Sequence, residues 1–110
     1  MLKNFVSVYV PGTTGLNGKF DKKSQDDYTK KIAAKLSAAF GGATAIPSTG
    51  YYVSDDGQLI EERIIIVKSY HEDKLNFSAY EFIKDIACNI KLDLLQEAVT
   101  IESEEGIEFI

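Results

Sequence analysis

The sequence predicts an α+β fold in which two helices cover one face of an antiparallel sheet. Three observations indicate this class. Strand-like and helical stretches follow one another in the order β-α-β-β-α-β, each helical stretch begins with a serine-led capping sequence, and a strong turn joins the two middle strands. The chain has 110 residues, of which 45% are hydrophobic. We therefore expect a single α+β domain over residues 1–110.

The first half of the chain supplies one strand, a glycine-rich loop and one helix. Asn4–Val10 alternates between valine on one face and larger or polar residues on the other, which is typical of a strand. The loop Pro11–Phe20 follows. Ser24–Asp27 reads as a capping box, apolar residues then recur at helical spacing, and Gly41-Gly42 supplies a C-terminal stop.

The second half supplies a hairpin, a second helix and two short strands. Ala43–Val53 and Leu59–Tyr70 are extended and flank the turn Ser54–Gly57. A second capping box at Ser78–Glu81 begins a helical apolar stripe that ends near Leu94. "EAVTIES" and "GIEFI" then read as two strands around a turn. This order predicts a ferredoxin-like two-layer sandwich, β-α-β-β-α-β, with an extra C-terminal strand.

Two helices can cover only one face of such a sheet, yet the strands carry apolar residues on both faces. An exposed apolar face is usually an interface, so we expect a homodimer or a protein partner there. Tyr51 and Tyr52 alternate between the faces of their strand, so we expect one to pack and one to be exposed, and packing within the sheet is the favoured interpretation over a role in the interface. On the central strand, either the row Ile64/Ile66 or the row Ile65/Val67 must face away from the helices. The interface candidates are Phe5, Tyr9, Tyr51, Tyr52, Ile65 and Val67.

Charge is unevenly distributed along the chain. The formal net charge is −5, which argues against general nucleic-acid binding. Six lysines and three aspartates give residues 19–35 a net charge of +3, whereas residues 93–110 carry six carboxylates and no basic residue. This acidic edge either protects an edge hairpin from aggregation or imitates a phosphate backbone toward a basic partner. Its central members are Glu102, Glu104, Glu105 and Glu108.

Residues of catalytic type are few and lack a recognisable motif. The glycines of "PGTTGLNGKF" do not have the spacing of a P-loop or of a dinucleotide fingerprint, which leaves a flexible connection or a contact loop. Asp55 and Asp56 suit a tight turn better than a cation site. His71 reads as a loop histidine and Cys88 as a helix-flank thiol. We expect no catalytic residue, no metal and no cofactor.

The apolar runs are too short to span a membrane, and the first residues do not resemble a signal peptide. We therefore expect a cytoplasmic protein without membrane contacts.

Three stretches together carry a resemblance: "VYVPGTTG", "FGGATAIPSTGYYVSDDGQLIEE" and the C-terminal "LLQEAVTIE" with "GIEFI". They resemble a group of small uncharacterised bacterial proteins of mobile elements, of FGGAT type. The resemblance implies a ferredoxin-like fold and an accessory protein that contacts host machinery. It carries no catalytic motif.

These observations predict a non-enzymatic accessory protein that acts through protein–protein contacts, with the chain itself or a protein as partner. The alternative is a small dimeric, cofactor-free enzyme or small-molecule-binding domain. In that alternative, Tyr9, Tyr51 or Tyr52 line a pocket with His71 at its mouth.

Overall fold

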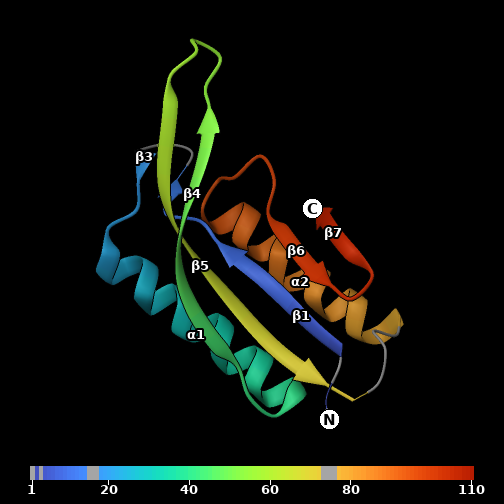
Figure 1. The fold of residues 1–110 in the computed structure, drawn as a ribbon. Coiled ribbons are helices and arrows are strands. Elements are labelled where there is room, and N and C mark those ends of the chain that lie inside the picture. Colours follow the sequence, from blue (N-terminus) through green and yellow to red (C-terminus); the bar gives the residue numbers. More distant parts are fainter. Residues whose placement is uncertain (1, 3, 15–17, 73–76) are drawn as a thin grey trace.

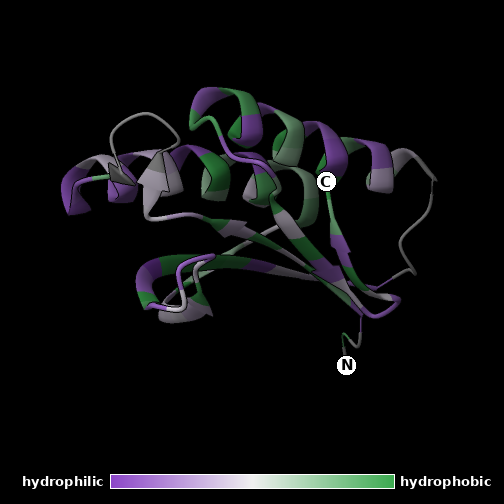
Figure 2. Cartoon of the chain, turned by 90° about the horizontal axis from the view of Figure 1, so that it is seen from above, coloured by the Kyte–Doolittle hydropathy of each residue, from purple (hydrophilic) through white to green (hydrophobic). Residues whose placement is uncertain are grey.

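The computed structural model describes residues 2, 4–14, 18–72 and 77–110. Two helices lie on one side of a five-stranded antiparallel sheet (Figures 1 and 2). The predicted two-layer α+β arrangement is therefore confirmed. The helices are α1 (Lys22–Phe40) and α2 (Phe77–Asp93), and the sheet strands are β1 (Asn4–Val10), β4 (Thr44–Val53), β5 (Leu59–His71), β6 (Thr100–Ser103) and β7 (Gly106–Phe109).

The strands lie in the order β4-β5-β1-β6-β7, and every neighbouring pair is antiparallel. Within the loop after β1, the two-residue strands β2 (Thr13–Thr14) and β3 (Gly18–Lys19) form a separate hairpin that the sequence did not predict. Residues 15–17 of this loop, Gly15 among them, lie outside the described residues.

The first helix begins earlier than its predicted capping box. Asp21 is the N-cap, and its carboxylate accepts hydrogen bonds from the Ser24 backbone N–H (2.9 Å) and the Ser24 hydroxyl (2.8 Å). Aspartate and serine both cap helices well, but Asp21, not Ser24, has the extended backbone that an N-cap requires. The predicted stop is confirmed, because Gly41 has φ 92° and its N–H donates to the Ser37 carbonyl at 2.8 Å.

The pairing of β1 with β5 decides which face of each strand meets the helices. Val8 lies opposite Val67, and Val10 lies opposite Ile65. The valines of β1 therefore share a face with Ile65 and Val67, and all of them are buried. The prediction that Ile65 and Val67 belong to an exposed interface is wrong. They pack in the core with Ile32, Leu36, Ile83, Ile86, Ala87, Ile90 and Ile101.

The hairpin of β4 and β5 extends past the ends of both helices (Figure 1). Tyr51 and Tyr52 lie on this overhang and expose 61% and 54% of their surface, so both are exposed where packing within the sheet was the favoured interpretation. The overhang leaves them no helix to pack against. Over the described part of the chain, no helix is both long enough and apolar enough to cross a membrane.

Candidate functional site

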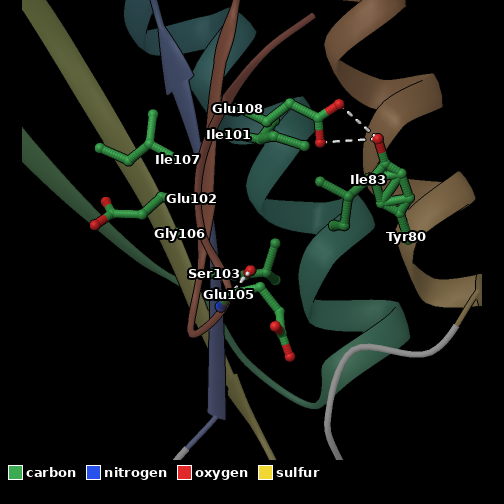
Figure 3. A pocket seen from close by; sticks show the side chains of 10 residues that line it. Tyr80, Ile83, Ile101, Glu102, Ser103, Glu105, Gly106, Ile107 and Glu108 are labelled. Carbon is green, nitrogen blue, oxygen red and sulfur yellow. Dashed lines mark hydrogen bonds between the residues drawn. The ribbon is translucent and has the colours of Figure 1, made fainter.

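A cleft of about 320 Å³ lies between the start of α2 and the β6–β7 hairpin (Figure 3). We call it the hairpin cleft. Its floor is apolar, formed by Val6, Ile83 and Ile101, all of which are buried. Its rim carries polar groups from two segments far apart in the sequence. The rim residues are Tyr80 on α2 and Ser103, Glu105 and Glu108 on the hairpin.

Strand register explains why these groups converge. Ile101 of β6 lies opposite Glu108 of β7, so both side chains point toward the helix layer. Glu102 and Ile107 form the next pair and point to the other side of the hairpin (Figure 3). A four-residue strand on each side of a two-residue turn thus divides the C-terminal glutamates between the two faces of the sheet.

Tyr80 and Glu108 close one side of the hairpin cleft. The Tyr80 hydroxyl donates to the two carboxylate oxygens of Glu108, at 2.7 Å to Oε1 and 2.8 Å to Oε2. The hydrogen bond to this carboxylate, followed by desolvation and by the negative charges of Glu108 and Glu81, raises the pKa of Tyr80 above its usual 10.0. Tyr80 is therefore a neutral donor at physiological pH and cannot serve there as a base.

A second polar group lies on the face of the sheet away from the helices. The Tyr9 hydroxyl donates to Glu102 Oε1 at 3.1 Å, and the Thr13 hydroxyl donates to Glu62 Oε2 at 2.6 Å. Partial burial, and then the bond to Glu102, raise the pKa of Tyr9. Tyr9 and Glu62 line a hollow of only about 100 Å³ together with Ile64 and Gln96. Small-molecule sites usually occupy about 300–1,000 Å³, so this hollow alone is too small for one.

The described part of the glycine-rich loop is held by close packing and by hydrogen bonds. A Cβ on Gly12 would overlap the Arg63 carbonyl oxygen, so a glycine is required where the loop crosses β5. The Gly12 carbonyl accepts from the Phe20 N–H at 2.9 Å, and the Thr13 carbonyl accepts from the Gln96 side chain at 2.7 Å. The first bond joins the two ends of the loop, and the second ties its first arm to the segment that follows α2.

The remaining sequence candidates occupy separate places. Asp56 accepts hydrogen bonds from the Ser54 hydroxyl and from the Gln58 N–H, as an aspartate in a tight turn does. These two hydrogen bonds lower the pKa of Asp56. His71 packs against Phe40 with 5.3 Å between ring centroids, at the opposite end of the sheet from Tyr51 and Tyr52. The pocket proposed from Tyr9, Tyr51, Tyr52 and His71 does not form.

The acidic edge of the sequence prediction is divided among different partners. Glu102 binds Tyr9, Glu104 accepts from the Phe5 N–H at 3.4 Å, and Glu108 binds Tyr80. Among the residues that the structure describes, no group of three or more His, Cys, Asp or Glu side chains is arranged to hold a metal ion.

Sequence reasoning overlooked Tyr80. Its only signal was a position inside the predicted capping segment Ser78–Glu81, on the same side of the helix as Ile83 three residues later.

No family model and no curated protein matches the chain. Two solved structures are similar to it. One is a phage SAM lyase in complex with S-methyl-5'-thioadenosine, with a TM-score of 0.68 and 16% identity over 97% of this chain and 88% of that chain. The other is a phage SAM lyase in the apo state, with a TM-score of 0.69 and 18% identity over 99% and 89%. These similarities establish a common fold.

The comparison corrects the predicted function. The sequence predicted a non-enzymatic accessory protein because no catalytic motif was found. The solved structures that share this fold over nearly the whole chain are those of an enzyme. The resemblance to mobile-element proteins of FGGAT type stays a prediction.

Proposed function

We propose that this protein is an enzyme that binds S-adenosylmethionine in the hairpin cleft and cleaves it to S-methyl-5'-thioadenosine. The observation that carries the proposal is the fold shared with phage SAM lyase over 97–99% of this chain. We also assign the fold to the ferredoxin-like class. Without β2, β3 and β7, the four remaining strands β4, β5, β1 and β6 lie in the order second, third, first, fourth, which supports this assignment.

Charge selects the hairpin cleft over the other hollows of the protein. S-adenosylmethionine carries two cations, a sulfonium and an ammonium, and one carboxylate, so its net charge is +1. Carboxylates and aromatic rings are the groups that attract its cations. The hairpin cleft offers Glu105, Glu108 and the Tyr80 ring around an apolar floor. A hollow of about 370 Å³ beside Phe40 and Tyr70 is larger, but Lys68 lines it and would repel both cations.

The apolar floor has a separate role in the reaction. Cleavage breaks the bond between sulfur and the four-carbon amino-acid chain, and the electron pair of that bond stays on sulfur. The positive charge on sulfur therefore disappears in the product thioether. An apolar surface beside sulfur favours this loss of charge, whereas a carboxylate beside sulfur would stabilise the substrate more than the transition state. We accordingly assign the sulfonium to the floor of Val6, Ile83 and Ile101, and the ammonium to the rim.

The carbon fragment can be completed without water or a cofactor. It either closes on its own carboxylate to form a lactone, or loses a proton from the neighbouring carbon to a rim carboxylate, Glu105 or Glu108, to form an alkene. The two products are isomers, so nuclear magnetic resonance of the reaction mixture tells them apart. A hydrolysed product would instead identify a hydrolase.

The test compares two ligands that differ in charge. Calorimetry measures binding of S-adenosylmethionine and of the neutral S-methyl-5'-thioadenosine to the intact protein and to Glu108→Gln. We expect the variant to weaken binding of S-adenosylmethionine by about tenfold or more and to change binding of the thioether much less, because only the former loses a charge partner. Chromatography of the reaction mixture measures thioether release.

The control variant Asp56→Asn removes a carboxylate from the remote hairpin turn and should leave both affinities unchanged. Absence of binding and turnover in the unaltered protein would overturn the proposed function. Binding that Glu108→Gln and Tyr80→Phe both leave unchanged would retain the function but remove it from the hairpin cleft.

A further inference from the structure

A lysine lies beside the rim of the hairpin cleft. Lys84 follows Tyr80 by four positions on α2, so both side chains lie on the same face of the helix, and the Lys84 ammonium lies 6.0 Å from the centre of the Tyr80 ring. Lys84 takes part in no ion pair with a residue that the structure describes. Its positive charge is therefore available to a ligand at this rim.

The ligand of the proposed function has a group that needs such a charge. In S-adenosylmethionine one carbon carries both the ammonium and the carboxylate, and two methylene groups separate this carbon from the sulfonium. The rim glutamates and the apolar floor are assigned to the two cations, which leaves the carboxylate without a partner. A carboxylate that is taken out of water needs a cation or several hydrogen-bond donors.

Opposite charges lie beside two parts of the Tyr80 side chain. Its hydroxyl donates to Glu108 at 2.7 Å, a contact that Figure 3 shows, and its ring lies beside the Lys84 ammonium. The rim therefore presents a carboxylate and an ammonium as neighbours. A ligand group with an ammonium and a carboxylate on one carbon is complementary to this arrangement, because each of its charges meets the opposite one.

We infer, on the basis of the proposed function, that Lys84 binds the carboxylate of the ligand while Glu108 binds its ammonium. The hairpin cleft then selects sulfonium compounds that retain an intact α-amino acid group. A sulfonium compound without the carboxylate forms no ion pair with Lys84 and brings its own ammonium close to a like charge. Lys84 is thus the residue that determines specificity for this part of the substrate.

Lys84 does not cancel the attraction of the rim for cations. Glu105 and Glu108 both line the cleft, whereas the hollow that contains Lys68 has no carboxylate among the described residues that line it. The distance between Lys84 and the Tyr80 ring is at the outer limit for a contact of this kind. The ammonium can therefore leave the ring for a carboxylate at small cost.

Both products of the proposed reaction remain accessible when Lys84 binds the carboxylate. A carboxylate has two oxygens, so one oxygen bound to Lys84 leaves the other free to close the lactone. Formation of the alkene does not use this carboxylate.

Calorimetry on the intact chain compares S-adenosylmethionine with its decarboxylated analogue, which keeps the sulfonium and the ammonium but lacks the carboxylate. We expect the unaltered protein to bind S-adenosylmethionine more tightly by about tenfold or more. Lys84→Met keeps the length of the side chain and removes its charge. Because the analogue carries the larger positive charge, the rim glutamates should then attract it at least as strongly, and the preference should disappear.

Lys91→Met, in the last turn of α2, is the matched control and should retain the preference. Circular dichroism establishes that both variants are folded. Equal affinities of the unaltered protein for the two ligands would overturn the inference, as would a preference that persists in folded Lys84→Met.

A second pair of ligands separates this inference from the proposed function. S-methylmethionine is a sulfonium compound with an α-amino acid group and no nucleoside, and titration followed by nuclear magnetic resonance compares it with its own decarboxylated analogue. A preference for S-methylmethionine that depends on Lys84, without release of the thioether from S-adenosylmethionine, would support the inference and overturn the proposed function. Thioether release without a preference that depends on Lys84 would do the opposite. A protein that binds none of these ligands would overturn both.

Discussion

The two helices meet the sheet in contrasting ways. Where α1 begins, Gln25 is 1% exposed and fills the junction: its Nε2 donates to the carbonyls of Val10 (3.3 Å) and Arg63 (3.0 Å). The Arg63 guanidinium returns a bond to Gln25 Oε1 at 2.7 Å and reaches Asp26 at 3.2 Å. This junction is sealed by polar groups that satisfy one another.

The junction of α2 with the β6–β7 hairpin is hollow by comparison. Its polar pair, Tyr80 with Glu108, lies at the exposed rim, and apolar residues lie beneath it. A polar group at a rim can exchange its partner for a ligand with little desolvation, whereas breaking the buried Gln25 bonds would leave polar groups without partners. The same layer arrangement thus contains one junction suited to stability and one suited to binding.

The largest expected effect on the free energy of unfolding comes from shortening one core residue in each helix. Leu36→Ala in α1 and Ile83→Ala in α2 each remove a fully buried side chain, which costs about 2–5 kcal/mol of unfolding free energy. We expect Leu36→Ala at the upper end. Ile83 adjoins the hairpin cleft, so its neighbours can relax into existing space. Urea denaturation measures both. A cost for Ile83→Ala above that for Leu36→Ala would show that the cleft wall is as rigid as the sealed side.

Removing the hydrogen bonds of Gln25 at the start of α1 should have the next largest effect on the free energy of unfolding. Gln25→Met keeps the volume of the side chain but leaves the carbonyls of Val10 and Arg63 without this donor, which costs about 1–3 kcal/mol. Gln58→Met, at an exposed position in the β4–β5 turn, is the matched control. Thermal denaturation compares the pair. Equal melting temperatures would mean that the network contributes nothing net to stability.

The smallest effect should appear at alkaline pH, where the two helices are linked. The Tyr28 hydroxyl of α1 donates to Asp93 Oδ2 of α2 at 2.8 Å. Partial burial, followed by the bond to Asp93 and its charge, raises the pKa of Tyr28 above 10.0. The folded state therefore retains this proton longer than the unfolded state. The contribution is complete below pH 10 and is lost as pH rises through the raised pKa.

Urea midpoints measured at pH 8 and at pH 11 in the intact protein and in Tyr28→Phe test this link. We expect the intact protein to lose more stability over the interval. An identical loss in both proteins would show that other groups account for the alkaline dependence.

Sequence patterns predicted where the helices and strands lie better than they predicted which face of each strand is buried. Alternation in β1 identified the buried valines, and Gly41 identified the end of α1, because both signals are local. The run Ile64–Val67 has no polar position to indicate a direction, so only its register with β1 assigns Ile65 and Val67 to the core. The overhang that exposes Tyr51 and Tyr52 depends on the length of β4 and β5 relative to the helices, which no local pattern encodes.

The hairpin cleft was beyond sequence reasoning for a related reason. Tyr80 and Glu108 are 28 positions apart, and they meet because α2 crosses the sheet beside β6 and β7. The proposed site for an organic cation, built from a tyrosine, glutamates and an apolar floor, has no fixed spacing comparable to a metal or phosphate motif. The absence of such a motif was therefore no indication that the protein lacks an activity.

Three tyrosines also determine how the acidic C-terminal region responds to salt. The hydroxyls of Tyr9, Tyr28 and Tyr80 are neutral and each donates a hydrogen bond to a carboxylate of this region. The acceptors are Glu102, Asp93 and Glu108. Dissolved ions weaken interactions between separated charges, including repulsion among these carboxylates, far more than they weaken short hydrogen bonds from neutral donors. Raising the ionic strength should therefore tighten the β6–β7 hairpin against the sheet, the reverse of what a hairpin held by lysine–glutamate pairs would do.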